Sequence, residues 1–306
     1  IAMALEGMPR QASTHACGVV ITKDPVDTYV PLYVRDNQIS TQYIMTTLEE
    51  LGLLKMDFLG LRTLTVIKDT INLVKENKGI DVKFDKDMSD PKVYKLWQEG
   101  TTSGIFQFES QGMTNFMKEL KPDCLEDLIA GVSLYRPGPM DQIPRYIRGK
   151  QNPGHNEYTH PSLEPILNVT YGCMVYQEQV MQIVRDLAGY SLGRADLVRR
   201  AMGKKKLDVM AKEREVFING QVDEDGKIVV PGCVRNGIDA ESANKIFDEM
   251  AEFAKYAFNK SHAACYAVVA YRTAYLKAYY PAEFMASMLN SFLGNLDKIP
   301  MYIDEC

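Results

Sequence analysis

Hydrophobic positions change their spacing after about sixty residues. Before that point, short runs of β-branched and aromatic residues between polar turns predict strands over about 15–21, 29–34 and 53–58. From Thr63 onward, apolar residues recur every three or four positions, the period of an amphipathic helix, and Gly79 is a helix stop. The chain therefore passes from a short strand-rich region to a long helical one.

Proline and glycine interrupt the helical period in the rest of the chain. The Pro-Gly-Pro sequence at 137–139 cannot lie inside a helix, and 149–162 is a polar loop. Helices are expected over 110–120, 124–134, 175–188, 191–203, 207–217, 239–253, 261–281 and then to about 292. We predict an α+β fold that is predominantly α, with a small mixed α/β domain at 1–62 and a large helical domain at 63–306.

The composition is that of an ordinary globular protein, with 306 residues, 46% hydrophobic, 25% charged and a net charge of −5. A uniformly basic coat protein is excluded, although a local basic site is not. The longest apolar run, 263–271, is too short to span a membrane, and the N-terminus lacks a signal-peptide pattern. Because the chain begins with Ile, we expect a piece of a longer protein. Six cysteines without a Cys-x-x-Cys pair indicate reduced cytosolic thiols.

The third predicted strand carries the clearest chemical signal. Side chains alternate along a strand, so Lys55 and Asp57 share one face. Leu54, Met56 and Phe58 share the other face and are expected to pack on a core. A carboxylate beside an ammonium group suits a site that binds Mg²⁺ and phosphate together. The alternative is a surface ion pair on an edge strand.

A second candidate is the basic cluster at 194–214, which has eight basic and three acidic side chains. On a helix, Arg200 and Lys204 share a face and Arg199 borders it. Clustered arginine and lysine side chains recognise phosphate. The alternative is a charged, solvated helix end.

Two further segments present basic side chains beside a stiff turn. Arg136 directly precedes the Pro-Gly-Pro sequence. Lys260 and His262 flank Ser261, the expected N-cap of a helix, where free backbone N–H groups attract phosphate. Each segment could also be an ordinary interhelical turn or cap.

Other motifs point to no site. His15 and Cys17 form a His-x-Cys pair without two further ligands nearby, so no metal site is expected there. The carboxylates at 85–87 and 223–225 are interpreted as loop residues. Walker A, Gly-x-Gly-x-x-Gly and Gly-x-Ser-x-Gly sequences are all absent, which argues against these nucleotide-binding and hydrolase classes.

Taken together and in order, several motifs resemble one family. They occupy 5–10, 13–21, 55–61, 104–110, 134–140, 176–181, 196–206, 258–264 and 281–286. The chain resembles the alpha subunits of bacterial DNA polymerase III, the C-family replicative polymerases. The resemblance implies that 1–62 is the end of the polymerase palm and that 63–306 is the fingers domain.

The resemblance also implies a reaction and a site. The reaction is template-directed transfer of dNMP to a primer 3′-OH with release of pyrophosphate, assisted by two Mg²⁺ ions. Asp57 is then a catalytic aspartate and metal ligand. Phosphate-binding roles fall to Lys55, Arg199, Arg200, Lys204, Arg10 and His15, and the DNA or nucleotide path to Arg136, Lys205, Lys206, Lys260 and His262.

One aspartate cannot clamp two ions, and the family's other carboxylates lie outside this segment, so we expect the isolated chain to be inactive. The implied partners are primer–template DNA and dNTP, with the sliding clamp and other replisome subunits bound through other regions, in the cytoplasm. The alternative is a non-catalytic nucleic-acid-binding scaffold derived from the same fingers.

Overall fold

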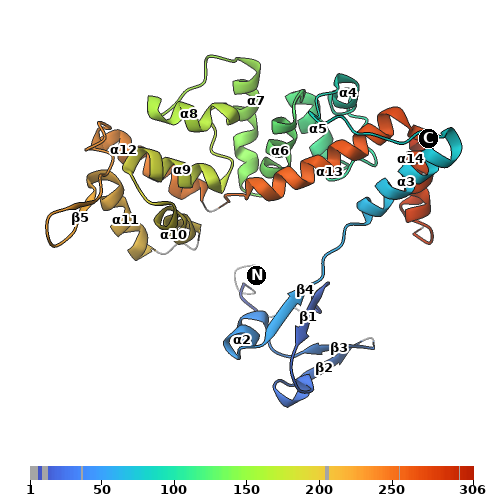
Figure 1. Cartoon of the computed structure of the whole chain (residues 1–306), viewed down its shortest axis with the longest axis horizontal. Coiled ribbons are helices and arrows are strands. Elements are labelled where there is room, and N and C mark those ends of the chain that lie inside the picture. Colours follow the sequence, from blue (N-terminus) through green and yellow to red (C-terminus); the bar gives the residue numbers. More distant parts are fainter. Residues whose placement is uncertain (1–5, 9–12, 36, 204–206, 255, 296) are drawn as a thin grey trace. The chain divides into compact units, whose positions relative to one another are not determined.

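The computed structural model describes residues 6–8, 13–35, 37–203, 207–254, 256–295 and 297–306. The chain divides into two compact units, Ile1–Arg62 and Thr63–Cys306. The first unit contains short strands and the second is helical, as Figure 1 shows. The predicted α+β, predominantly α fold is confirmed. In the described part of the chain, no helix has both the length and the apolar character needed to cross a membrane.

The first unit is built from two antiparallel ribbons. Its elements are β1 (Gly18–Ile21), the 3-10 helix η1 (Val26–Thr28), β2 (Leu32–Arg35), β3 (Gln38–Thr41), α2 (Met45–Glu50) and β4 (Leu54–Asp57). Strand β1 pairs with β4, and β2 pairs with β3. The chain folds back so that β1 lies beside a strand about 35 residues further along, and this pairing places residues 18–21 against 54–57.

Among its described residues, the helical unit has one small hairpin, formed by β5 (Gln221–Val222) and β6 (Ile228–Val230). Its α-helices are α3 (Arg62–Lys78), α4 (Pro91–Glu99), α5 (Gln111–Leu120), α6 (Leu125–Leu134), α7 (Ile143–Gln151), α8 (Glu164–Leu167), α9 (Gln177–Ala188), α10 (Leu192–Gly203), α11 (Leu207–Asn219), α12 (Ala240–Phe253), α13 (Lys260–Tyr279), α14 (Pro281–Ser291) and α15 (Ile299–Glu305). Three 3-10 helices join them: η2 (Pro139–Gln142), η3 (Pro161–Leu163) and η4 (Asn168–Thr170).

Sequence signals explain where several of these helices begin and end. Asp239 caps α12 by accepting a hydrogen bond from the Ser242 amide, as predicted. Gly189 adopts the left-handed conformation that ends α9. Helix α7 continues to Gln151, so the polar loop begins later than its composition suggested.

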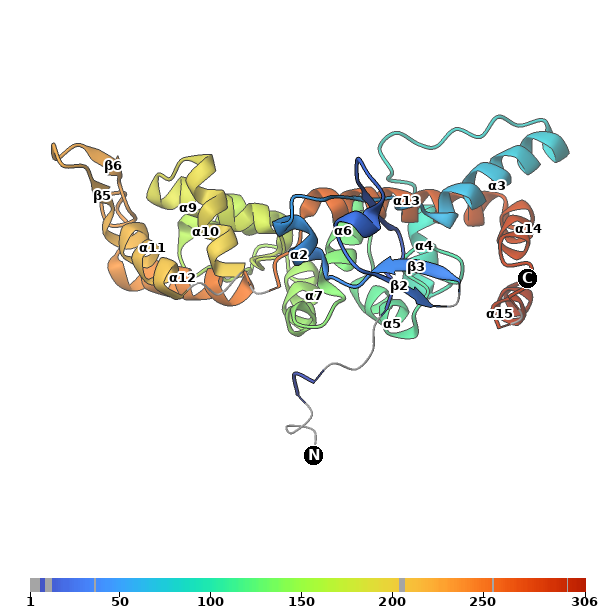
Figure 2. The same cartoon turned by 90° about the horizontal axis from the view of Figure 1, so that it is seen from below.

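Apolar helix faces of this unit meet in three clusters. Helices α4 to α7 pack with α13 around Trp97 and Phe108, whereas α8 to α12 pack around Phe217 and Phe247. A smaller cluster joins α3 to α14 and α15. Figures 1 and 2 show α13 lying along α6, with α9 to α12 grouped beyond one end of α13 and α14 at its other end.

A buried ion pair ties α7 to α6. The Lys150 ammonium lies 2.6 Å from Asp127, whose side chain is 1% exposed, and 2.8 Å from the exposed Asp123. Burial alone would lower the pKa of Lys150, but the hydrogen bonds to the two aspartates outweigh it and raise the pKa. This pair is an interior structural contact of the helical unit.

Candidate functional site

The β1–β4 ribbon places Lys55 and Asp57 on one face, as the alternation predicted. Gly18 lies opposite Asp57, and Val20 lies opposite Lys55. The Lys55 ammonium hydrogen-bonds Oδ1 of Asp57, and this bond holds the pKa of Asp57 below its usual value. Within the described residues, no hydrogen bond or ion pair reaches Oδ2, so one oxygen of a half-exposed, ionised carboxylate stays available to a ligand.

His15 lies beside β1, on the same side of the ribbon as Asp57. Its Nδ1 is 4.0 Å from Oδ1 of Asp57 and accepts a 2.7 Å hydrogen bond from the Gly18 amide. A Cβ atom on Gly18 would lie only 2.8 Å from Cε of Lys55 and 2.9 Å from Nδ1 of His15. A side chain at position 18 would therefore displace the side chains of Lys55 and His15, which converge directly above its α-carbon.

The opposite face of the ribbon contradicts the sequence prediction. Leu54, Met56 and Phe58 do not pack on a core; their exposed fractions are 57%, 43% and 63%. Val19 and Ile21, which share this face, are also exposed. The prediction was wrong because, in the described part of the unit, the sheet has two strands and no layer covers its apolar side.

Helix α10 carries the two arginines of the basic cluster. Ser191 accepts a hydrogen bond from the Arg194 amide at the start of this helix. Arg199 donates from Nε and Nη2 to Oδ1 of Asp196, and Arg200 lies 2.7 Å from Oδ2 of the same carboxylate. The pKa of Asp196 is lowered chiefly by the hydrogen bond from Arg199.

The two arginines differ in how much of their guanidinium group is engaged. Arg199 also donates from Nη1 to Gln177, and its side chain is 24% exposed. Arg200 is 63% exposed, and among the described residues only Asp196 forms an ion pair with it. Arg200 thus presents more donors to a ligand than Arg199 does.

The remaining arginines of the cluster hold helices together. Arg194 pairs with Glu213 at 3.1 Å, and Arg214 pairs with Asp248 and lies over the Phe247 ring. The three lysines at 204–206 lie outside the described residues, as does Arg10. The net positive charge counted from the sequence is therefore partly neutralised by partners within the fold.

Arg136 and the segment before α13 lie together. The Arg136 guanidinium stacks on the Phe258 ring at 3.9 Å and donates a 2.9 Å hydrogen bond to the Tyr256 carbonyl. Burial lowers the pKa of Arg136. The Pro-Gly-Pro turn follows at once, and its Gly138 (φ +105°) lies so close to the Tyr256 ring that a side chain at position 138 would collide with it. These contacts of Arg136 thus hold in place the segment that leads into α13.

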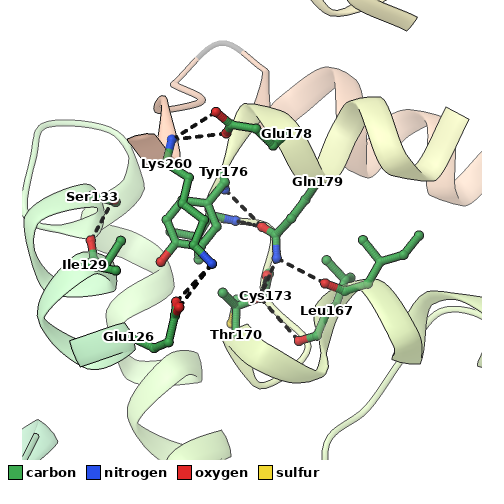
Figure 3. A network of polar contacts seen from close by, with 12 residues as sticks. Glu126, Ile129, Ser133, Leu167, Thr170, Cys173, Tyr176, Glu178, Gln179 and Lys260 are labelled. Atoms are coloured by element: carbon green, nitrogen blue, oxygen red, sulfur yellow. Dashed lines mark hydrogen bonds and ion pairs between the residues drawn. The ribbon is translucent and has the colours of Figure 1, made fainter. Parts of the chain in front are cut away.

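The start of α13 corrects the predicted cap. Asn259, and not Ser261, is the N-cap, and its side chain accepts a 2.9 Å hydrogen bond from the His262 amide. The Lys260 amide donates to the Glu178 carboxylate at 3.1 and 3.2 Å, as Figure 3 shows. The N–H groups expected to attract phosphate are therefore partly satisfied by the protein's own side chains.

The side chain of Lys260 points into the junction between α6 and α9 in Figure 3. Its ammonium lies 3.0 Å from Glu126 and 5.1 Å from the centre of the Tyr176 ring. The exposed His262 instead contacts the Tyr266 ring in a tilted arrangement, with ring centres 4.2 Å apart. Of Lys260 and His262, both predicted to lie on the DNA or nucleotide path, His262 is the more accessible.

Several partners of these residues were not identified from the sequence. Asp196 lies three and four positions before the two arginines, a helical ion-pair spacing that was available as a signal. The Glu178–Lys260 contact spans 82 residues and has no local signal. Gln179 is buried beside it, where its side chain accepts from the Val175 and Tyr176 amides and donates to Thr170 (Figure 3).

Among the described residues of the β1–β4 ribbon, Asp57 could ligate a metal ion. Asp57 offers carboxylate oxygen, the donor that Mg²⁺ prefers, and fits such an ion. His15 and Cys17 have side-chain atoms within 4.8 Å of it. A second group comprises Asp123, Cys124 and Asp127, and its two aspartates already bind the Lys150 ammonium. One available carboxylate does not clamp two ions.

Comparison with known proteins gives two family matches. Residues 63–225 match the bacterial DNA polymerase III alpha subunit finger domain, and residues 1–60 match the bacterial DNA polymerase III alpha NTPase domain. The first match alone covers more than half of the chain.

Similar full-length relatives carry the name DNA polymerase III subunit alpha. Those of Thermus aquaticus, Borreliella burgdorferi and Bacillus subtilis are 50%, 48% and 45% identical over 100%, 99% and 100% of this chain. The chain spans about a quarter of the length of these relatives (25%, 26% and 26%). The chain therefore belongs to the family of the bacterial DNA polymerase III alpha subunit.

Proposed function

We propose that this chain is the end of the palm (residues 1–62) and the fingers (63–306) of a DNA-directed DNA polymerase. The longer protein transfers dNMP from dNTP to a primer 3′-OH on a DNA template and releases pyrophosphate. Its partners are primer–template DNA and dNTP, with the sliding clamp and other replisome subunits reached through other regions. Its place of action is the bacterial cytoplasm.

The Lys55–Asp57 pair is the observation that carries this proposal. An ionised carboxylate with one available oxygen stands beside an ammonium group on the open face of a ribbon. The carboxylate is suited to hold a metal ion, and the ammonium group to offset negative charge on a phosphate. Asp57 is the proposed metal ligand, and Lys55 is the proposed phosphate contact.

Helix α10 of the helical unit carries further proposed phosphate contacts. Among the described residues, Arg200 forms an ion pair with Asp196 only, so it keeps further N–H donors for a ligand. It is the proposed direct contact with the triphosphate. Arg199, bound on both sides by Asp196 and Gln177, sets the orientation of the pair. Arg10 and Lys204 are further proposed phosphate contacts, and the proposed DNA or nucleotide path comprises Arg136, Lys205, Lys206, Lys260 and His262.

Mg²⁺ is the proposed cofactor, and it supplies Lewis-acid stabilisation of the reacting phosphate when bound. Asp57 would hold it, together with carboxylates from other parts of the longer protein. Because the described residues contribute one such ligand, the 306-residue chain alone is expected to be inactive in primer extension. Robust Mg²⁺-dependent synthesis by the isolated chain would contradict this.

The main test uses a full-length polymerase of the family that contains this segment. Asp57→Asn keeps the size of the side chain but removes its charge, and should lower kcat about 10²–10³-fold. Arg200→Ala should raise KM for dNTP about tenfold or more, because a charge-assisted hydrogen bond contributes about 1.5–3 kcal/mol.

Arg185→Ala is the matched control. Arg185 is an exposed arginine on α9 that pairs with its neighbour Asp186, and its loss should leave both kinetic constants unchanged. Unchanged nucleotide kinetics in Arg200→Ala would remove the triphosphate role. Full activity of Asp57→Asn would remove the metal-ligand role, whereas DNA binding without any synthesis by the unsubstituted longer protein would favour the other candidate, a non-catalytic nucleic-acid-binding scaffold.

A further inference from the structure

We infer that His15 is a positioning residue for the Asp57 site. In this inference, its Nδ1 holds the turn that sets Gly18 opposite Asp57, and its ring is not a metal ligand through that nitrogen. The inference deepens the proposed function, because the importance of the turn rests on the role proposed for Asp57.

The hydrogen bonds of Nδ1 define the tautomer. The Gly18 amide donates to Nδ1 at 2.7 Å, and the Cys17 amide approaches it at 3.2 Å. Backbone amides are donors only, so the nitrogen that accepts from them carries no proton. The ring proton therefore sits on Nε2, which is the ring nitrogen left for any contact with a phosphate or with water.

These bonds also hold in place the backbone at Gly18, above which the side chains of Lys55 and Asp57 lie. They close a tight turn over residues 15–18 and bring Gly18 into register with Asp57. The space above the α-carbon of Gly18 is so narrow that a methyl group there would be 2.8 Å from Lys55 and 3.1 Å from Oδ1 of Asp57. A shift of this turn would therefore displace the support beneath both side chains, and misplacement by about 1 Å can cost about 10²-fold in rate.

The same bonds remove Nδ1 of His15 as a ligand from a cluster that has metal-binding composition. His15, Cys17 and Asp57 place one ligand atom each within 4.8 Å of one another. However, the in-plane lone pair of Nδ1 is already directed to backbone amides, and Oδ1 of Asp57 is bonded to Lys55. Metal ligation through Nδ1 would require the turn to open.

Two substitutions separate the ring nitrogens. Asparagine at position 15 places an amide oxygen where Nδ1 stands, whereas glutamine reaches the position of Nε2. In the full-length polymerase, we expect His15→Asn to keep kcat within about threefold, and His15→Gln and His15→Ala to lower kcat at least about tenfold with little change in KM for DNA. The reverse order, or equal activity of all three variants, would overturn the positioning role.

A measurement without catalysis keeps this inference separate from the proposed function. In the 306-residue chain, ¹⁵N-labelled histidine NMR should show Nδ1 of His15 unprotonated; the chain has four histidines, so loss of one signal in His15→Asn assigns it. Hydrogen exchange at the Gly18 amide should stay slow in His15→Asn and become fast in His15→Gln. A protonated Nδ1, or equally fast Gly18 exchange in the unsubstituted chain and in both variants, would end the inference even if the polymerase proposal holds.

Discussion

The Asp57 ribbon and the helical unit hold their charged side chains by different means. In the helical unit, ion pairs such as Lys150–Asp127 are set between packed helices, with Asp127 fully enclosed. On the β1–β4 ribbon, Lys55 and Asp57 stand on a two-stranded sheet whose apolar side is exposed.

This difference shows what positions each site. Packing defines the helical unit, so a change in its interior is transmitted through the core. The ribbon relies on strand register, on the His15 turn and on the glycine at position 18. Its chemistry is therefore expected to respond to local hydrogen bonds more than to hydrophobic burial.

The sharpest test of the comparison replaces one phenylalanine in each unit. Phe247 is fully buried, and Phe247→Ala should lower the free energy of unfolding of the helical unit by about 3–5 kcal/mol, because it leaves a cavity. Phe58 is 63% exposed, and Phe58→Ala should change stability by no more than about 0.5 kcal/mol. Urea denaturation of the 306-residue chain measures both. Equal losses would show that the ribbon also depends on a packed core.

The second test compares the two lysine–aspartate pairs. Lys150→Met leaves Asp127 buried without its partner and should cost up to about 3–5 kcal/mol, again measured in urea. Lys55→Met leaves Asp57, which is 44% exposed, in contact with water, so it should cost no more than about 1 kcal/mol.

Asp123→Asn provides the control for the buried pair, because Asp123 is the exposed partner of Lys150 and its loss should cost no more than about 1 kcal/mol. A Lys150→Met protein as stable as the parent would mean that Asp127 becomes neutral or finds another partner at little cost.

The smallest effect concerns pH and the surface pair on α10. The pKa of Asp196 is lowered in the folded chain, so its contribution to stability is present above the unfolded value of about 3.9 and is lost as the pH falls through the folded pKa. An NMR titration of the Asp196 carboxyl should show this low value. Arg199→Gln should raise the pKa back toward the ordinary range, since the hydrogen bond from Arg199 is the main cause of the shift. A titration unaltered by that substitution would assign the shift to another group.

The sequence predicts elements well where the signal is local. The strand bearing Asp57, the cap at Asp239 and the stop at Gly189 all follow from residue type and spacing. Prediction failed at Ser261, because Asn259 is an equally good capping residue two positions earlier and is the one that bonds the helix.

The candidate site was less predictable than the fold. Alternation placed Lys55 beside Asp57, but the approach of His15 depends on the pairing of β1 with β4, which composition does not specify. The alternation also predicted a buried face at Met56, although burial depends on what covers a sheet and not on its own pattern. Likewise, the sequence around Lys260 does not indicate that its ammonium group pairs with Glu126 or that its amide bonds to Glu178.

The carboxylate of Asp196 competes with any anion that would bind the two α10 arginines. An anion that approaches Arg199 and Arg200 has to exchange with a side chain that already contacts both. A singly charged anion gains little from that exchange, whereas a ligand with several adjacent negative charges can displace one carboxylate. Selectivity for highly charged ligands would then arise because each ligand competes with the Asp196 carboxylate for the two arginines. No pocket shaped to exclude singly charged anions would be needed.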